Sequence, residues 1–213
     1  YILVIHNFNN DNFQLLCDKL GKKDKHLRSI IKTHGYPPLW SRAPSFTTLI
    51  NIILEQQVSL ASARAAFLKL QEKIGHITPE KILLLSDWEL KTCYFSRQKI
   101  IYARHLATTI VNKELVFDQL NILSDEEIRT QLKKLKGIGD WTVDVYLMMS
   151  LNRCNCFPTG DIALIKSIKE VKNLAPETTK ETILEIANSW QPYRTIAAYL
   201  LWHTYIIKRN IKF

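Results

Sequence analysis

The chain has 213 residues, 46% of them hydrophobic, which is enough for one large or two small domains with a buried core. Its 29 Lys and Arg against 20 Asp and Glu give a formal net charge of +9, which favours a polyanionic partner, nucleic acid before an anionic membrane. No apolar run approaches the length of a membrane span, and the opening residues 1–5 are too short for a signal-peptide core. The composition therefore argues against a membrane protein or a secreted one.

The four cysteines do not have the sequence spacing of a zinc site. Only Cys154 and Cys156 are close in sequence, and no second Cys or His pair follows them at a suitable spacing. Reduced thiols are the expectation for an intracellular protein.

Apolar residues recur at helical spacing along most of the chain. The pattern predicts a helix over residues 11–20 and a second short helix that begins with residues 27–31 and ends near Gly35. A proline-rich loop, residues 37–44, then marks a domain boundary. Trp40 in this loop is expected to pack against a neighbouring helix, with a direct contact to DNA as the alternative. A long apolar helix follows Ser45, and further helices are predicted over 61–74, after Thr78, after Ser86 and over 100–111.

Two helices over residues 127–135 and 141–151 flank the segment Gly137-Ile138-Gly139. Ser124 and Glu127 have capping-box spacing at the start of the first helix. Glycine accepts positive φ and lets another molecule approach closely, so the segment predicts a tight hairpin. The N–H groups that begin the second helix would then bind an anion such as phosphate. An ordinary helix–helix turn with a glycine C-cap is the alternative.

The remaining chain is also helical in pattern, over residues 162–171, over 177–189, and after Pro192 through 205. With sustained alternation confined to the first few residues, the sequence predicts an all-α protein. Asp161 stands directly after Gly160 at the start of a helix, where an aspartate is most often only an N-cap.

Four separated motifs between residues 45 and 203 resemble those of the helix-hairpin-helix–GPD superfamily of DNA glycosylases, and in particular the 3-methyladenine DNA glycosylase II family. They are Gln56-Gln57-Val58-Ser59, Ser96-Arg97-Gln98-Lys99, the hairpin Leu135-Lys136-Gly137-Ile138-Gly139-Asp140-Trp141-Thr142 with Asp161 about twenty residues after it, and Trp190-Gln191-Pro192-Tyr193-Arg194. The resemblance implies two helical lobes with an active-site cleft between them. Residues 45–153 would form the central lobe, and residues 1–44 with 154–213 the second.

The resemblance identifies Asp161 as the catalytic carboxylate and Trp141 and Trp202 as walls of the base pocket. Breaking an N-glycosidic bond places positive charge on the sugar, which a carboxylate beside C1′ stabilises. Alkylated bases are cationic or electron-poor, so aromatic faces bind them by stacking and cation–π attraction. Core packing is the alternative role for both tryptophans. Val145 occupies the position of a third pocket aromatic in some members, which leaves the substrate range open.

The resemblance also implies the DNA contacts. Gln57 would insert into the duplex where the damaged base has left, with Gln56 beside it. An inserted residue is needed because extruding a base costs stacking energy. The other implied contacts are made by Gly137, Gly139, Thr142, Arg97 and Lys99. A bulky residue at position 139 is expected to weaken DNA binding through loss of the hairpin geometry.

No cofactor is expected to be required. The resemblance implies a structural Na⁺ or K⁺ ion on the backbone carbonyls of Lys133, Leu135 and Ile138. Some relatives carry an iron–sulfur cluster on four cysteines that follow the catalytic aspartate. This cluster is excluded because no cysteine follows Cys156.

The function implied is a monofunctional DNA glycosylase that hydrolyses the N-glycosidic bond of alkylated bases of the 3-methyladenine type in base excision repair. Its partner would be double-stranded DNA with an alkylated base, and it would act as an intracellular monomer, in the cytoplasm or nucleoid of a bacterium or the nucleus of a eukaryote. Two alternatives remain. One is a bifunctional glycosylase/lyase, although lyase members carry a catalytic lysine where this chain has Trp141. The other is a non-catalytic helix-hairpin-helix module that only binds DNA.

Overall fold

A computed structural model describes residues 6–211 of the chain. Residues 1–5, on which the signal-peptide argument rests, lie outside the described residues. Between residues 6 and 211 there are thirteen α-helices and no β-strand, only an isolated antiparallel bridge from Asn7 to Arg153. The prediction of an all-α protein is confirmed. Among these helices, none has the length and apolar character needed to cross a membrane.

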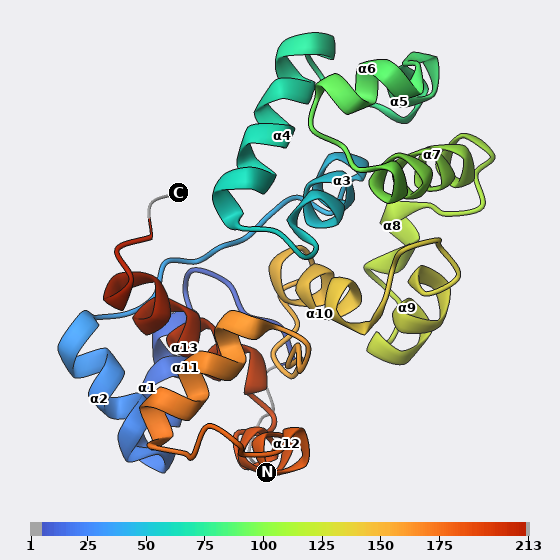
Figure 1. The fold of residues 1–213 in the computed structure, drawn as a ribbon. Helices are drawn as coiled ribbons and strands as arrows, with labels where there is room; N and C mark the ends of the chain where they lie inside the picture. The colour runs from blue at the N-terminus through green and yellow to red at the C-terminus, as the bar shows by residue number, and fades with distance from the viewer. Residues whose placement is uncertain (1–5, 212–213) are drawn as a thin grey trace. The chain divides into compact units, whose positions relative to one another are not determined.

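The helices form two compact units (Figure 1). Among the described residues, the first unit combines residues 6–41 with residues 147–211, and the second runs from Arg42 to Tyr146. The first unit contains α1 (Phe13–Lys23), α2 (Lys25–His34), α11 (Ile162–Lys172), α12 (Lys180–Asn188) and α13 (Arg194–Lys208). The second contains α3 (Phe46–Glu55), α4 (Leu60–Ile74), α5 (Pro79–Leu84), α6 (Asp87–Thr92), α7 (Arg97–Val111), α8 (Phe117–Leu120) and α9 (Asp125–Leu132). Helix α10 (Asp140–Met149) begins in the second unit and ends in the first.

The core of the first unit is built around α13, which packs against α1, α2, α11 and α12. In Figure 1 the blue N-terminal helices lie beside the orange and red C-terminal ones, although they are far apart in sequence. Every residue of α13 from Thr195 to Trp202 is buried. A helix that is apolar on all sides needs neighbours on all sides, so α13 brings the two ends of the chain together.

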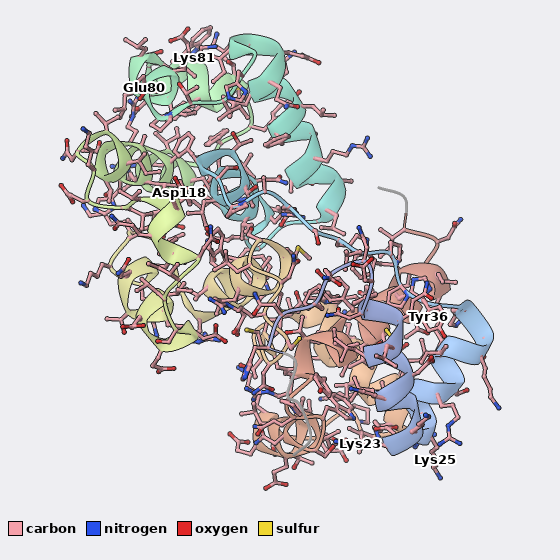
Figure 2. The ribbon with its side chains drawn as sticks, turned by 180° about the vertical axis from the view of Figure 1, so that it is seen from behind. Lys23, Lys25, Tyr36, Glu80, Lys81 and Asp118 are labelled. Atoms are coloured by element: carbon pink, nitrogen blue, oxygen red, sulfur yellow. The ribbon has the colours of Figure 1, made fainter. Side chains whose placement is uncertain are left out.

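A buried carboxylate joins three segments of this unit. Lys23 and Lys25 are exposed at the turn between α1 and α2 (Figure 2), whereas Asp24 between them is only 8% exposed. Asp24 accepts hydrogen bonds from the first N–H groups of α2, from Lys172 Nζ of α11 and, at 2.8 Å, from Trp190 Nε1. Burial alone would raise the pKa of Asp24, but the hydrogen bonds from Lys172 and Trp190 outweigh it, and the pKa lies below its ordinary value of 3.8.

The second unit is built on α3, whose Leu49, Ile50, Ile52, Ile53 and Leu54 are all buried. Helix α3 packs against α4 and α7, and α7 also contacts α5 and α6. Most of these helices begin at the residues that the sequence indicates, because a Ser or Thr side chain accepts the N–H group three residues on. The residues that do so are Ser45, Ser59, Thr78, Ser86, Ser96 and Ser124.

Some details differ from the sequence-based expectation, and α8 and α9 are two of them. Helix α9 ends at Leu132 rather than residue 135, because the chain tightens there: Leu135 N donates to Leu132 O and Ile138 N donates to Leu135 O. The four-residue helix α8 was not expected, since it is too short to show a helical period.

The contacts of Asp24 with Lys172 and Trp190 should stabilise the folded protein. Asp24→Asn keeps an N-cap but leaves the Lys172 ammonium without its anion, so it should lower the free energy of unfolding by about 3 kcal/mol at pH 7. Because the folded pKa of Asp24 is depressed, this stabilisation is present above pH 3.8 and lost as the pH falls through the lower folded value. Urea unfolding of both proteins between pH 7 and pH 3 measures it.

The exposed pair Lys69–Glu72 supplies a control. Glu72→Gln should change stability by less than about 0.5 kcal/mol at every pH. An Asp24→Asn deficit that is equally large at pH 7 and pH 3 would contradict the assignment of the stabilisation to the ionised carboxylate.

Candidate active site

Asp161 is held at the first turn of α11 in the first unit. Its Oδ1 accepts a hydrogen bond from Leu164 N at 2.7 Å, its own N–H donates to Pro158 O at 2.9 Å, and its carbonyl accepts from Ile165 N at 2.9 Å. The side chain is partly exposed. Asp161 is therefore the N-cap of α11, as its place in the sequence indicates, and the start of a helix stabilises a negative charge.

A second donor holds the same oxygen. Trp202 Nε1 on α13 donates to Asp161 Oδ1 at 3.2 Å, so two of the predicted site residues meet in the structure. Trp202 is only 8% exposed. Its ring lies 6.0 Å from that of Tyr199 and 6.4 Å from that of Trp40, measured between centroids. Trp202 thus offers its N–H group to the carboxylate and little ring surface to a ligand.

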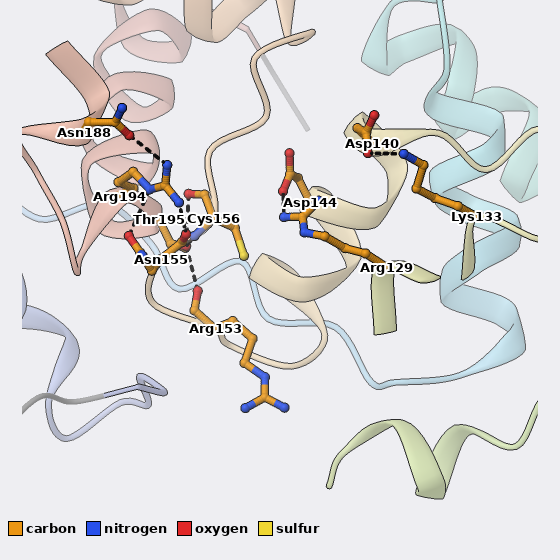
Figure 3. Close-up of polar contacts among 10 residues, drawn as sticks. All are labelled: Arg129, Lys133, Asp140, Asp144, Arg153, Asn155, Cys156, Asn188, Arg194 and Thr195. Carbon is orange, nitrogen blue, oxygen red and sulfur yellow. Dashed lines mark hydrogen bonds and ion pairs between the residues drawn. The ribbon is translucent and has the colours of Figure 1, made fainter. Parts of the chain in front are cut away.

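The segment that leads to Asp161 is tied to the start of α13 (Figure 3). Thr195 Oγ1 accepts from Cys156 N at 2.9 Å and donates to Arg153 O at 2.6 Å. Arg194 donates to both the side chain and the carbonyl of Asn155, at 2.9 and 2.8 Å. This explains Arg194, the last residue of the fourth motif, for which the sequence offered no role: it fixes the chain that carries the carboxylate.

The hairpin in the second unit depends on Gly137. Gly137 has φ +79°, and a Cβ atom there would lie 2.2 Å from the Tyr102 ring of α7. One turn along α7, His105 Nδ1 accepts a hydrogen bond from Lys136 N at 3.3 Å. Only glycine combines this backbone conformation with this packing. Tyr102 and His105 lie three apart on one helix face, but nothing in the sequence indicates that the face meets the hairpin.

Gly139 differs from Gly137. No positive φ is required at Gly139, and a Cβ atom there would meet no atom within 4 Å. The expectation that a bulky residue at position 139 weakens DNA binding through loss of the hairpin geometry stays a prediction, but the positive φ and the close packing of the hairpin lie at Gly137. The open space beside Gly139 instead allows a close approach by another molecule.

Gln56 links the end of α3 to the hairpin. Its Nε2 donates to Gly137 O and to Thr142 Oγ1, both at 2.9 Å. The next residue, Gln57, is exposed and has φ +57°. Thr142 is only 2% exposed, and its hydroxyl is engaged by Gln56 within the protein. The DNA contact implied for Thr142 stays a prediction.

Lys99 has a structural partner that the motif did not indicate. Its Nζ donates to Leu54 O near the end of α3 at 2.7 Å, and burial lowers its pKa. With Val58 and Tyr94 it lines a cavity of about 290 Å³. Arg97 is exposed at the first position of α7. The phosphate contacts implied for Arg97 and Lys99 stay predictions.

Ion pairs surround the start of α10 (Figure 3). Lys133 Nζ lies 2.7 Å from Asp140 Oδ1, and Arg129 pairs with Asp144, which is 6% exposed. Trp141 is partly exposed in the first turn of the helix. It belongs to the second unit, whereas Asp161 and Trp202 belong to the first. The cleft that the resemblance implies between the lobes stays a prediction.

The comparison with protein families agrees with these features. A model of the "HhH-GPD superfamily base excision DNA repair protein" family matches residues 50–192, about two thirds of the chain. The chain belongs to the HhH-GPD superfamily. The resemblance seen in the four motifs is thereby confirmed.

Known members of the HhH-GPD superfamily resemble most of this chain. A putative DNA-3-methyladenine glycosylase of Bacillus subtilis, YfjP, is 30% identical over 202 residues, which cover 91% of this chain and 70% of that protein. DNA-3-methyladenine glycosylase 1 of Schizosaccharomyces pombe is 29% identical over 192 residues, covering 87% and 84%. The structure of the fission-yeast 3-methyladenine DNA glycosylase Mag1 in complex with abasic DNA superposes with a TM-score of 0.82 at 29% identity, over 89% of this chain and 96% of that one.

The family resemblance implies a monovalent cation at the hairpin, held by the backbone carbonyls of Lys133, Leu135 and Ile138. Leu135 O accepts one hydrogen bond, from Ile138 N at 3.2 Å, and a carbonyl oxygen has a second lone pair. Neutral carbonyl oxygens are suitable ligands for Na⁺ and K⁺. The carbonyls of Lys133, Leu135 and Ile138 therefore fit in kind. Residues 6–211 contain no group of three His, Cys, Asp or Glu side chains that could hold a metal ion.

The two hairpin glycines should respond differently to alanine. Gly137→Ala should lower the free energy of unfolding by about 2 kcal/mol or more, from the left-handed backbone and the clash with Tyr102. Gly139→Ala should change it by less than about 0.5 kcal/mol but weaken binding to DNA with an abasic-site analogue, because its Cβ occupies the open space where a phosphate would approach. Urea unfolding and fluorescence anisotropy at two salt concentrations measure both.

Gly75→Ala is the matched control, because Gly75 also has a positive φ (+67°) but open space around it. Its stability loss measures the backbone cost alone. Wild-type DNA affinity in Gly139→Ala would argue against the hairpin as the phosphate anchor.

Proposed function

We propose that this protein is a monofunctional DNA glycosylase that hydrolyses the N-glycosidic bond of alkylated bases of the 3-methyladenine type in base excision repair. The single observation that carries the proposal is Asp161, a partly exposed carboxylate whose Oδ1 accepts from both Leu164 N and Trp202 Nε1. The names of the superfamily relatives support the same chemistry.

Asp161 supplies a fixed negative charge to a reaction that develops positive charge. As the glycosidic bond stretches, the sugar acquires oxocarbenium character and the base leaves with the bonding electrons. A carboxylate beside C1′ stabilises that charge electrostatically, and because it is already oriented by two N–H donors it needs little reorganisation. A water molecule then adds to C1′ and loses a proton to the solvent, which leaves an abasic site.

Trp141 is the reason to expect that this protein does not cleave the DNA strand. A lyase needs an amine nucleophile that forms a Schiff base with the sugar, and an indole cannot do this. The fold alone does not decide the matter, because the structure of a Clostridium acetobutylicum 8-oxoguanine glycosylase/lyase has the same fold at 18% identity, with a TM-score of 0.78.

Double-stranded DNA is the proposed partner. The hairpin N–H groups and Arg97 would contact phosphates, and the exposed Gln57 would fill the space of the extruded base. A Na⁺ or K⁺ ion on the hairpin carbonyls would keep the backbone in place. The protein would act as an intracellular monomer wherever the DNA lies, in the cytoplasm or nucleoid of a bacterium or the nucleus of a eukaryote. A module that only binds DNA would have no need of the oriented carboxylate.

Asp161→Asn tests the catalytic role. The variant keeps an N-cap but removes the charge, so single-turnover release of 3-methyladenine should slow on the order of 10²-fold or more, from about 3 kcal/mol for one preorganised electrostatic group. Affinity for DNA with an abasic analogue and the melting temperature should change little, because the charge acts mainly in the transition state.

Asp87→Asn is a suitable control for this experiment. Asp87 is another aspartate in the first turn of a helix, and its side chain is 67% exposed. This variant should release the base at the wild-type rate. If Asp161→Asn does the same, Asp161 is only a helix cap and the glycosylase proposal loses its central residue.

The product should be an intact strand with an abasic site. Borohydride added during turnover should trap no covalent complex between the protein and the DNA, whereas a glycosylase/lyase treated in parallel should give one. Denaturing gels of both strands and of the protein report the two results. Substantial trapping by this protein would favour the bifunctional alternative.

A further inference from the structure

Trp40 lies beside the residues that hold Asp161. Its ring centroid is 5.2 Å from that of Tyr199 and 6.4 Å from that of Trp202, with the Trp202 ring in an edge arrangement at 69°. Trp202 in turn donates its N–H to Asp161. All four residues belong to the first unit, so the aromatic group and the carboxylate form one constellation.

The Trp40 ring rests on a rigid support. Behind it, Tyr199 is fully buried and makes edge contacts with Phe8 and Phe13, at centroid distances of 5.6 and 5.5 Å. The Tyr199 hydroxyl donates to Trp40 O at 3.4 Å. A ring that is already immobilised loses little conformational entropy when a ligand stacks on it.

The backbone around Trp40 is restrained as well. The next residue, Ser41, donates from its hydroxyl to Asn152 Oδ1 at 3.0 Å. Two prolines, Pro37 and Pro38, precede Trp40 and restrict the conformations of the loop. The loop therefore holds the ring in a defined place, although it contains no regular secondary structure.

The two tryptophans differ in what they can offer a ligand. Trp202 is 8% exposed and its only polar group is bonded to Asp161, whereas Trp40 is partly exposed. Stacking requires accessible ring surface, and an N–H donor requires only an edge. The indole N–H of Trp202 is thus committed to the carboxylate, whereas part of Trp40 is accessible.

We propose that Trp40 is the base-contacting aromatic residue of the first unit and sets a preference for cationic bases, while Trp202 is a positioning residue that orients Asp161. The proposal rests on the glycosylase function proposed above and assigns its substrate selectivity to a named side chain. Tryptophan gives the strongest cation–π attraction of the aromatic residues. A base made cationic by alkylation gains from this ring, and an unmodified neutral base gains less.

The test compares binding with release. The lesion probe is duplex DNA containing 2′-fluoro-7-methyldeoxyguanosine, in which the base is cationic and the 2′-fluorine slows glycosidic cleavage. The reference probe is the same duplex with a tetrahydrofuran abasic analogue, which has no base. The ratio of the two affinities cancels any inactive fraction of a variant. Release of 7-methylguanine from ordinary substrate DNA is measured in single turnover.

Trp40→Leu should lose about tenfold in the lesion-to-abasic affinity ratio, the order expected of a desolvated cation–π contact, and should bind the abasic probe like the wild type. Trp202→Phe should keep the ratio and slow release, because it removes only the N–H donor to Asp161. Trp88→Leu is the matched control, since Trp88 on α6 is 70% exposed and belongs to neither proposed role. It should behave as the wild type in both measurements.

Each outcome bears on one claim. A wild-type protein that releases no base overturns the proposed function, whereas normal release with an unchanged ratio in Trp40→Leu overturns the assignment of Trp40 alone. If Trp40→Leu does not fold, Trp40→Phe carries the test. Its weaker ring should lower the ratio about threefold, and no loss in that variant also overturns the assignment. A lowered ratio in Trp202→Phe overturns its positioning role.

Discussion

One carboxylate oxygen of the first unit is held by two separate helices. Asp161 Oδ1 accepts from a backbone N–H group of α11 and from an indole N–H group of α13, and α13 is the helix around which the unit packs. The carboxylate proposed for catalysis is thus tied to the core of the first unit. Arg194 and Thr195 extend the same principle, because they fix the segment before Asp161 through hydrogen bonds to its backbone.

The second unit contains the hairpin whose backbone N–H groups are proposed to contact DNA. A glycine hairpin is intrinsically flexible, and here three side chains restrain it: Tyr102 packs on Gly137, His105 accepts from Lys136 N, and Gln56 donates to Gly137 O. The same glutamine adjoins Gln57, whose backbone is left-handed. The restraint therefore connects the hairpin with the residue that the family resemblance places in the duplex.

Local signals in the sequence predicted the helix starts, the hairpin and the helix-capping place of Asp161, because capping residues and glycines act over a few residues. Contacts between distant segments were not predictable in this way. Nothing near Trp40 in the sequence indicates that it meets Trp202, and nothing near Gly139 indicates that Gly137 alone carries the positive φ. The solvent exposure of Trp40 and Trp202, on which their proposed roles depend, is likewise set by residues that are distant in the sequence.

The discontinuity of the first unit has a consequence for the order of folding. The second unit, Arg42 to Tyr146, is one continuous stretch and can form as soon as that stretch has been synthesised. The first unit cannot close until α13 has emerged, because α1 and α2 must wait for a partner helix about 160 residues further on. Closing so long a loop costs only slightly more entropy than closing a short one, but it slows the search for the native contacts. The apolar faces of α1 and α2 are therefore the surfaces longest exposed to aggregation during synthesis.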